Sequence, residues 1–202
     1  TMVGAWERAL SVFYQVYTYV CTVDPKKPEP IKGLVWFGPD VSYTSVFTPF
    51  YSTMNKLPAS FQTGGPQKFS SKAAWWAFDF INSWSRLNFQ LITNSDIKPL
   101  QKELEQNSRI MLANIEENIS SQNKDEVINY LTKYCNDNGN MIVERWWELA
   151  AELVAKYADG YINLPNGQYA TPNIELPRTV GYPSWWLDKT NYKQGPTTYE
   201  MK

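Results

Sequence analysis

The 202-residue chain contains no histidine and only two cysteines, Cys21 and Cys135. Without histidine it cannot by itself form a Ser-His-Asp or Cys-His catalytic site, an HExxH zinc site or most mixed Cys/His metal sites. Two thiols are too few for a zinc site of four cysteines or for a dense disulfide framework. We therefore expect no metal or other cofactor. Whether Cys21 and Cys135 pair with each other stays open, because the composition does not identify the compartment.

An excess of charge of one sign is also lacking, and so are long apolar runs. Nineteen basic residues stand against twenty acidic ones, for a net charge of -1. No block of Lys and Arg stands out, so we expect no electrostatic binding of nucleic acid or anionic membrane. No apolar run approaches the ~20 residues that span a bilayer, so we expect no membrane span. With 43% hydrophobic and 19% charged residues, the composition is that of a globular chain with a sizeable core.

Aromatic residues, in contrast, are abundant at 15% of the chain, and six of the nine tryptophans form adjacent pairs. The pairs are Trp75-Trp76, Trp146-Trp147 and Trp185-Trp186. One interpretation is that these rings are platforms for a sugar or peptide ligand. The other, which we favour, is that neighbours on a helix point about 100° apart, so one ring of each pair lies in the core and the other at its boundary.

The first third of the chain has the pattern of β-structure. Runs of β-branched and aromatic residues predict strands at Leu10–Val23, Leu34–Phe37 and Thr44–Phe47. The proline-rich segment Asp24–Pro30 separates the first two, and Pro49 is expected at an edge or in a loop. Residues 52–69 are expected to form a loop.

Helical periodicity follows. We expect a helix over 71–92 with Ser70 or Ser71 as its N-cap, a helix from Asp96 through Ile119, and further helices at Asn123–Cys135 and Asn138–Tyr157, the last ended by Asp159-Gly160. The inward-facing residues of the last two helices are expected to be Val127, Ile128, Leu131, Ile142, Trp146, Leu149, Ala150 and Leu153.

These patterns predict an α+β protein in three parts. Residues 1–69 would hold the strands with their loops and 70–159 a helical region. Residues 160–202 would form an extended tail, pinned over the body by Trp185 and Trp186.

Few individual residues indicate chemistry. Arg145 between Glu144 and Glu148 is typical of a solvated helix face, and no pair of carboxylates supports a glycosidase. Asn118 begins a glycosylation sequon, which matters only on the secretory route. Thr1 would be a nucleophile if processing exposed its α-amine as the base. The first residues show no signal peptide, so we expect a mature product, a processed subunit or a piece of a longer chain.

Several runs together resemble the C-terminal half of the dipeptidase A family of cysteine peptidases, peptidase family C69. That family is similar to secernins and, more distantly, to penicillin V acylase. The runs are Gly33–Gly38, Tyr43–Tyr51, Leu57–Phe61, Phe69–Phe78, Leu100–Leu104, Trp146-Trp147 and Lys156–Gly160, which together cover nearly the whole chain.

The resemblance implies a partial αββα sandwich of the N-terminal nucleophile type. The family hydrolyses dipeptides with a cysteine that processing exposes, upstream of everything aligned here. Neither Cys21 nor Cys135 matches that cysteine, and Thr1 corresponds to an interior position. The resemblance thus implies that this chain contains no catalytic residue of its own. Tyr14 stands where the family has an arginine that would orient the nucleophile or a substrate carboxylate, and a tyrosine cannot supply that charge.

We therefore expect the C-terminal chain or fragment of a cysteine-type dipeptidase. Its partners would be the upstream N-terminal portion of the same enzyme, or a partner subunit, and a small peptide substrate. Three short strands cannot form two stacked sheets alone, which agrees with an incomplete domain. The alternative is a catalytically inactive, dipeptidase-like structural or binding subunit; a weaker idea is a carbohydrate-binding module. A secreted or lysosomal/vacuolar location is favoured over a cytoplasmic one.

Overall fold

The structure is a computed structural model that describes residues 9–119, 123–163, 178–179 and 184–191. The chain forms two compact units, Thr1–Ala151 and Glu152–Lys202. The first unit holds a three-stranded sheet followed by helices, so the predicted α+β class is confirmed. The second sheet of an αββα sandwich and the three-part division of the chain stay predictions.

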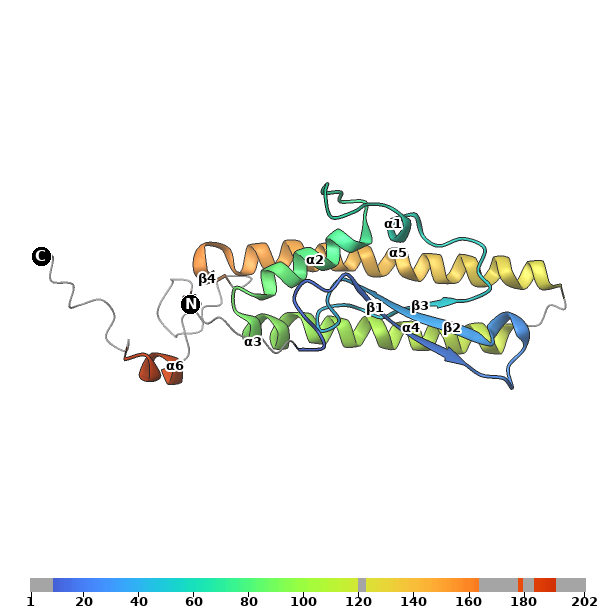
Figure 1. The fold of residues 1–202 in the computed structure, drawn as a ribbon, viewed down its shortest axis with the longest axis horizontal. Helices are drawn as coiled ribbons and strands as arrows, with labels where there is room; N and C mark the ends of the chain where they lie inside the picture. Colours follow the sequence, from blue (N-terminus) through green and yellow to red (C-terminus); the bar gives the residue numbers. More distant parts are fainter. Residues whose placement is uncertain (1–8, 120–122, 164–177, 180–183, 192–202) are drawn as a thin grey trace, which may run out of the picture. The chain divides into compact units, whose positions relative to one another are not determined.

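The sheet of the first unit is antiparallel, in the order β1-β2-β3 (Figure 1). Its strands are β1 (Tyr17–Val23), β2 (Gly33–Pro39) and β3 (Thr48–Tyr51). Tyr17 pairs with Pro39, and Trp36 pairs with Pro49. Pro49 therefore lies in an edge strand as expected, where its missing N–H costs no ladder hydrogen bond.

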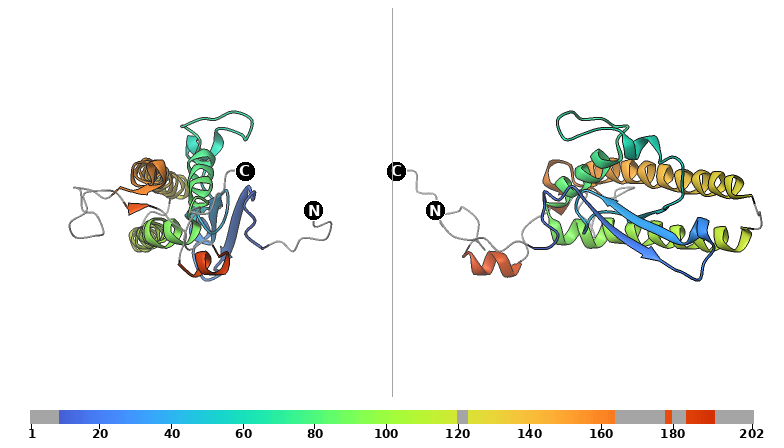
Figure 2. Two further views of the ribbon diagram at one scale, coloured as in Figure 1. Left: turned by 90° about the vertical axis from the view of Figure 1, so that its left-hand side faces the viewer. Right: turned by 45° about the vertical axis from the view of Figure 1, so that its right-hand side comes forward.

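Burial in the sheet increases from β1 to β3. All four residues of β3 are buried, whereas six of the seven residues of β1 are exposed. Figure 2 shows the sheet beside α4 (Lys98–Asn118) and α5 (Lys124–Lys156), with β1 as the strand farthest from both. In the part of the chain that the structure describes, β1 is therefore the free, exposed edge of the sheet.

The remaining elements are short. They are η1 (Glu29–Ile31), α1 (Ala59–Gln62), α2 (Ala74–Ser85), α3 (Phe89–Ile92), the π-helical turn η2 (Thr93–Ile97), η3 (Ala158–Gly160), β4 (Tyr161–Ile162), β5 (Arg178–Thr179) and α6 (Ser184–Lys189). β4 and β5 pair antiparallel in the second unit. Among the described residues, no helix combines the length and the apolarity needed to cross a bilayer.

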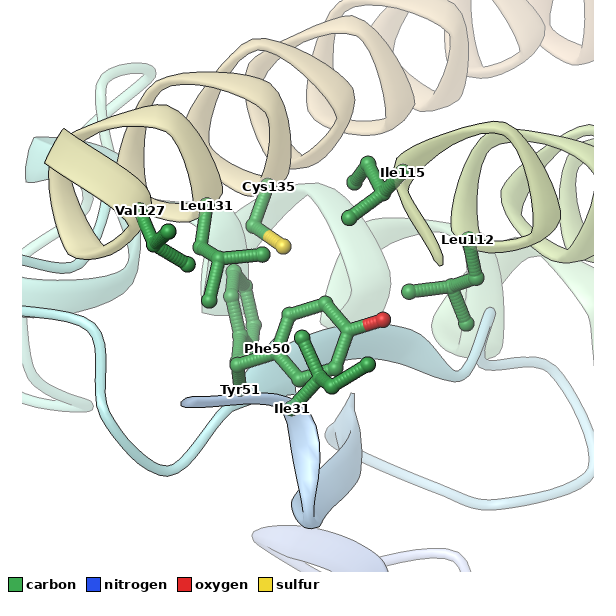
Figure 3. Packing of buried hydrophobic residues seen from close by; sticks show 8 residues of the cluster. All are labelled: Ile31, Phe50, Tyr51, Leu112, Ile115, Val127, Leu131 and Cys135. Carbon is green, nitrogen blue, oxygen red and sulfur yellow. The ribbon is translucent and has the colours of Figure 1, made fainter. Parts of the chain in front are cut away.

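One hydrophobic cluster joins the sheet to both long helices. As Figure 3 shows, side chains of η1, β3, α4 and α5 converge there: Ile31, Phe50, Tyr51, Leu112, Ile115, Val127, Leu131 and Cys135. The apolar stripes predicted for residues 96–119 and 123–135 both contribute to this cluster. It stabilises the packing of β3 between the two helices.

Two predicted strands are displaced. The first begins at Tyr17 rather than Leu10, and the third begins at Thr48 rather than Thr44. The ladder between β1 and β2 ends where the Asp40 N–H donates to the Val16 carbonyl at 2.8 Å. Asp40 then takes a left-handed backbone with φ 59°, so the chain turns away from the sheet before Thr44.

The predicted break near residue 136 is wrong, because α5 runs through it without interruption. Asn138 is buried and its Nδ2 donates to Ser108 Oγ of α4 at 3.1 Å, so its amide bonds within the core instead of ending a helix. A Cβ on Gly139 would lie 3.1 Å from Pro58 Cγ, so glycine allows the close approach of that loop. Tertiary contacts override the local helix-breaking signal here.

Other boundaries also differ from the prediction. The segment 71–92 divides into α2 and α3, and α2 begins after Ala73 without a side-chain cap, so neither Ser70 nor Ser71 caps it. Asp96 lies inside the helical turn η2 and is not a cap. The predicted loop 52–69 contains α1. The end of α5 at Lys156 is within one residue of the prediction, and Asp159 just beyond it is left-handed with φ 57°.

The expected extended tail is only partly described. Residues 184–189 form a helix, α6, within the segment expected to be extended. That Trp185 and Trp186 pin the tail over the body stays a prediction. Residues 164–177, 180–183 and 192–202 lie outside the described part of the chain.

Candidate functional site beside the end of the sheet

A hollow of about 350 Å³ opens next to the start of β1. Its apolar walls come from β1, β2, the α1 segment and α2, and include Tyr17, Phe37, Pro39, Phe61, Ala74 and Trp75. Tyr17 stacks on Phe37 with ring centroids 5.7 Å apart, so two neighbouring strands form one continuous wall. A cavity of this size and lining suits an apolar or aromatic side chain.

A glycine loop closes the other side of this hollow. Gly64 has φ +99°, a conformation that residues with a side chain rarely adopt, and a Cβ there would lie 2.6 Å from Ala73 Cβ. Glycine therefore lets residues 63–66 approach the start of α2. The indole N–H of Trp75, which lines the hollow, is buried and donates to no protein group.

The buried carboxyl group of Asp40 directly follows Pro39, which lines the hollow. Asp40 is 2% exposed, and its Oδ2 accepts no hydrogen bond from the protein. Burial is the main cause that raises the pKa of Asp40 from 3.8 to about 7, and the charge of Asp79 on α2 raises it further. Burial also raises the pKa of Asp79. Two carboxyl groups of raised pKa therefore lie close together at this end of the sheet.

Polar groups of α2 hold the segment that leads into β1. The Asn82 Nδ2 donates to the Phe13 carbonyl at 3.0 Å, and the Arg86 Nη2 donates to the same oxygen at 2.9 Å. The Tyr43 hydroxyl donates to Asn82 Oδ1 at 2.8 Å. The Arg86 guanidinium also lies 4.7 Å from the centre of the Phe13 ring. We call Asp40, Tyr43, Asp79, Asn82 and Arg86 the polar cluster.

Tyr14, which stands where the resemblance expects an arginine, lies next to this polar cluster. It is 51% exposed, and its ring meets that of Phe13 edge-on at 4.9 Å. Arg86, which is exposed, bonds to the adjacent residue of the chain. The positive charge that Tyr14 cannot supply is therefore carried by Arg86, the residue that caps the end of α2 and binds the carbonyl group just before Tyr14.

The two cysteines are free and do not pair with each other. Cys21 is exposed on β1, whereas Cys135 is fully buried in the cluster of Figure 3. Burial raises the pKa of the Cys135 thiol to about 12, which makes it a poor nucleophile at neutral pH. Thr1 lies outside the described residues.

The tryptophan pairs are not alike. Trp146 is fully buried and stacks on Phe78 at 5.3 Å, while Trp147 is only partly buried, as the core-and-boundary interpretation predicts. Trp75 and Trp76 are both partly buried. Arg145 pairs with Glu148 on the surface of α5, as expected of a solvated face.

The sequence patterns did not predict the polar cluster, and none of its residues was a candidate for a functional role. One signal was available: Asp79 and Asn82 interrupt the apolar pattern of α2, and polar residues on a buried helix face need partners. In the described residues, no group of three or more Cys, Asp or Glu side chains could hold a metal ion.

Comparison with known proteins gives the family. Residues 3–103, half of the chain, match the model of peptidase family C69, and the chain therefore belongs to that family. These residues include the sheet, the whole hollow and the whole polar cluster. The chain is also 23% identical over 149 residues to a "Probable dipeptidase" of Latilactobacillus sakei. That similarity covers 74% of this chain and 31% of the relative, so the chain spans about a third of the relative's length.

Proposed function

We propose that this chain is the C-terminal part of a cysteine-type dipeptidase, and that a polypeptide segment preceding it contributes the attacking thiol. Membership of peptidase family C69 carries this proposal. The name of the Latilactobacillus sakei relative supports a dipeptide substrate. Cys135 agrees with this, because it is buried and its pKa is raised, which makes it a poor nucleophile.

The chemistry would follow the N-terminal nucleophile pattern. The thiol gives its proton to the α-amine of its own residue and attacks the peptide carbonyl, so that a C–S bond forms. The peptide C–N bond then breaks, and the leaving amine takes the proton. Water hydrolyses the thioester, which releases the second product and restores the thiol. No step requires histidine, which this chain lacks.

The polar cluster would recognise the charged ends of the dipeptide. Arg86 is exposed and lies beside Tyr14, so its guanidinium would bind the substrate carboxylate with charge-assisted hydrogen bonds. Asp79, half-buried about two helical turns closer to the start of α2, would face the substrate ammonium. In this proposal Arg86 would supply the positive charge that Tyr14 lacks, which favours an active enzyme over an inactive subunit.

The test is turnover of a dipeptide panel by the complete polypeptide. The complete enzyme should cleave dipeptides and lose activity with iodoacetamide, and a variant carrying Cys21→Ser and Cys135→Ser should behave in the same way. The 202-residue chain alone should show no turnover. Loss of turnover in the double variant would place the attacking thiol in this chain. Absence of turnover in the complete polypeptide would support the inactive structural or binding subunit instead.

The role of Arg86 has its own test. Arg86→Ala should raise KM about tenfold or more, since a hydrogen bond to a charged group is worth about 1.5–3 kcal/mol. Arg86→Lys should retain part of the affinity. With a C-terminally amidated dipeptide, which has no carboxylate, wild type and Arg86→Ala should have similar KM values. As the matched control, Arg109→Ala removes an arginine of α4 that lies over the Trp36 ring at 5.2 Å. An equal rise of KM in Arg109→Ala would contradict carboxylate binding by Arg86. So would an equal effect of Arg86→Ala on the amidated dipeptide.

A further inference from the structure

We propose that the outer edge of β1 binds a β-strand from the part of the enzyme that precedes this chain, and that an apolar side chain at the end of that strand fills the hollow. This inference rests on the proposed function, because it names the contact between the two parts of the enzyme.

The hydrogen bonds of the sheet show which residues of β1 face outward. The Asp40 N–H donates to the Val16 carbonyl, and the Asp24 N–H donates to the Lys32 carbonyl at 3.0 Å. In an antiparallel ladder, alternate residues bond to the same neighbour, so the even-numbered residues of β1 bond to β2. The residues that direct their N–H and C=O groups outward are Tyr17, Tyr19, Cys21 and Val23.

The free part of this edge begins after Tyr17. The Gln15 Nε2 donates to the Tyr17 carbonyl at 3.3 Å, so the chain itself satisfies that acceptor. Beyond it, the sheet of the described residues ends at β1. The backbone groups of Tyr19, Cys21 and Val23 can therefore take a strand of about five residues, with one alternating pair of hydrogen bonds at each outward residue.

The composition of β1 is that of a strand that is covered in the complete protein. Its seven residues include no charge and no proline, the features that normally protect an edge from pairing. Tyr19 is 58% exposed and Val23 is 71% exposed. The opposite edge, β3, is buried and contains Pro49, so this sheet can grow only through β1.

The hollow lies where such a strand would end. Tyr17, Phe37 and Pro39 share one face of the sheet, as the pairing of Tyr17 with Pro39 and of Tyr19 with Phe37 shows. All three line the hollow. Strand addition gains affinity from main-chain hydrogen bonds and specificity from pockets for alternate side chains. The hollow would accept the side chain opposite Tyr17, two residues from the one opposite Tyr19, because residues two apart in a strand share a face.

A second copy of this chain fits the site less well. If β1 paired with itself along its full length around a two-fold axis, Tyr17 would face Val23 of the other copy. Val23 of that copy would then lie beside the hollow, and Asp24 would lie opposite Val16, which also lines it. Placing the charged side chain of Asp24 against this apolar lining is unfavourable. The relative from Latilactobacillus sakei, in contrast, has additional chain that could supply such a strand. Its match to this chain covers 31% of its length, so the unmatched part is more than twice as long as the matched part.

Photo-crosslinking of the complete enzyme tests this contact. Replacement Tyr19→p-benzoylphenylalanine should give a crosslink, after irradiation, to one segment of the preceding part, identified by peptide mass spectrometry. The same replacement at Tyr134, 40% exposed on α5, is the control and should not crosslink that segment. A crosslink to β1 of another copy, or none at all, would overturn the inference.

Hydrogen exchange in the same enzyme gives a second readout that needs no substitution. The amides of Tyr19, Cys21 and Val23 should be protected in the complete enzyme to a degree similar to those of Val20 and Thr22. Fast exchange at the three outward amides, in an enzyme that still cleaves dipeptides, would refute the strand contact and leave the proposed function intact. Protection and crosslinking without turnover would refute the function and leave the contact standing.

Discussion

Replacement of Asp40 by asparagine should stabilise the protein at neutral and alkaline pH but not in acid. The carboxyl group is almost fully buried, and its pKa rises from 3.8 to about 7 in the folded state, mainly because burial disfavours the charge. Between these two pH values the folded chain holds the proton and the unfolded chain has released it. Stability contributed by this group therefore falls as pH rises from about 4 to about 7.

The size of the effect follows from the same shift. At 1.36 kcal/mol for each pKa unit, a shift of roughly three units corresponds to a penalty of about 4 kcal/mol above pH 7. Asparagine has nearly the same shape, carries no charge and tolerates a left-handed backbone such as φ 59°. Asp40→Asn should therefore recover up to about 4 kcal/mol of unfolding free energy at pH 8 and almost none at pH 4.

Urea unfolding of wild type and variant at pH 4, 6 and 8 measures this difference directly. Asp159→Asn is the matched control, because Asp159 shares the left-handed backbone but is exposed. It separates the effect of burial from that of the chemical change. If Asp40→Asn shifted stability equally at pH 4 and pH 8, or destabilised the protein at pH 8, the argument from burial would be wrong.

Four further substitutions test the packing. Trp146→Ala, at a fully buried ring, should lower the unfolding free energy by about 3–5 kcal/mol, whereas Trp185→Ala, at a ring 57% exposed, should cost far less; thermal unfolding separates them. Ser108→Ala removes the partner of the buried Asn138 amide and should cost about 1–3 kcal/mol in urea unfolding, and no loss would show that the amide finds another partner. Gly139→Val should destabilise α5 packing by about 1–3 kcal/mol, because a Cβ there already meets the loop at 3.1 Å, and a stabilised variant would contradict that close approach.

The elements with clear periodicity were predictable because one face of each is apolar over several turns. Leu104 and Ile115 on α4 are buried as the spacing predicts, and so is Leu131 on α5. The position of β3 was not predictable, because Thr44 to Phe47 has the same β-forming composition as the strand itself. Only the left-handed Asp40 and the pairing of Trp36 with Pro49 place the strand after that segment.

The candidate site was predictable only in part. Gly64 and Gly65 lie in the segment 52–69, which was expected to form a loop, and the family resemblance included residues on both sides of them. The polar cluster, however, joins Asp40 and Tyr43 to residues of the α2 region about 40 positions later in the sequence, and no spacing rule connects them. Their chemistry arises from burial and mutual distance, which depend on how α2 packs beside the end of the sheet.

The amino-acid sequence by itself determined the class of the fold, the family and the absence of histidine chemistry in this chain, because composition, periodicity and motifs are local properties. Tertiary structure alone decided that Asp40 is buried, that Arg86 lies beside Tyr14 and that β1 is the open edge of the sheet. Each of these depends on which segments meet in space, since desolvation and hydrogen bonding act between residues that the chain order keeps apart.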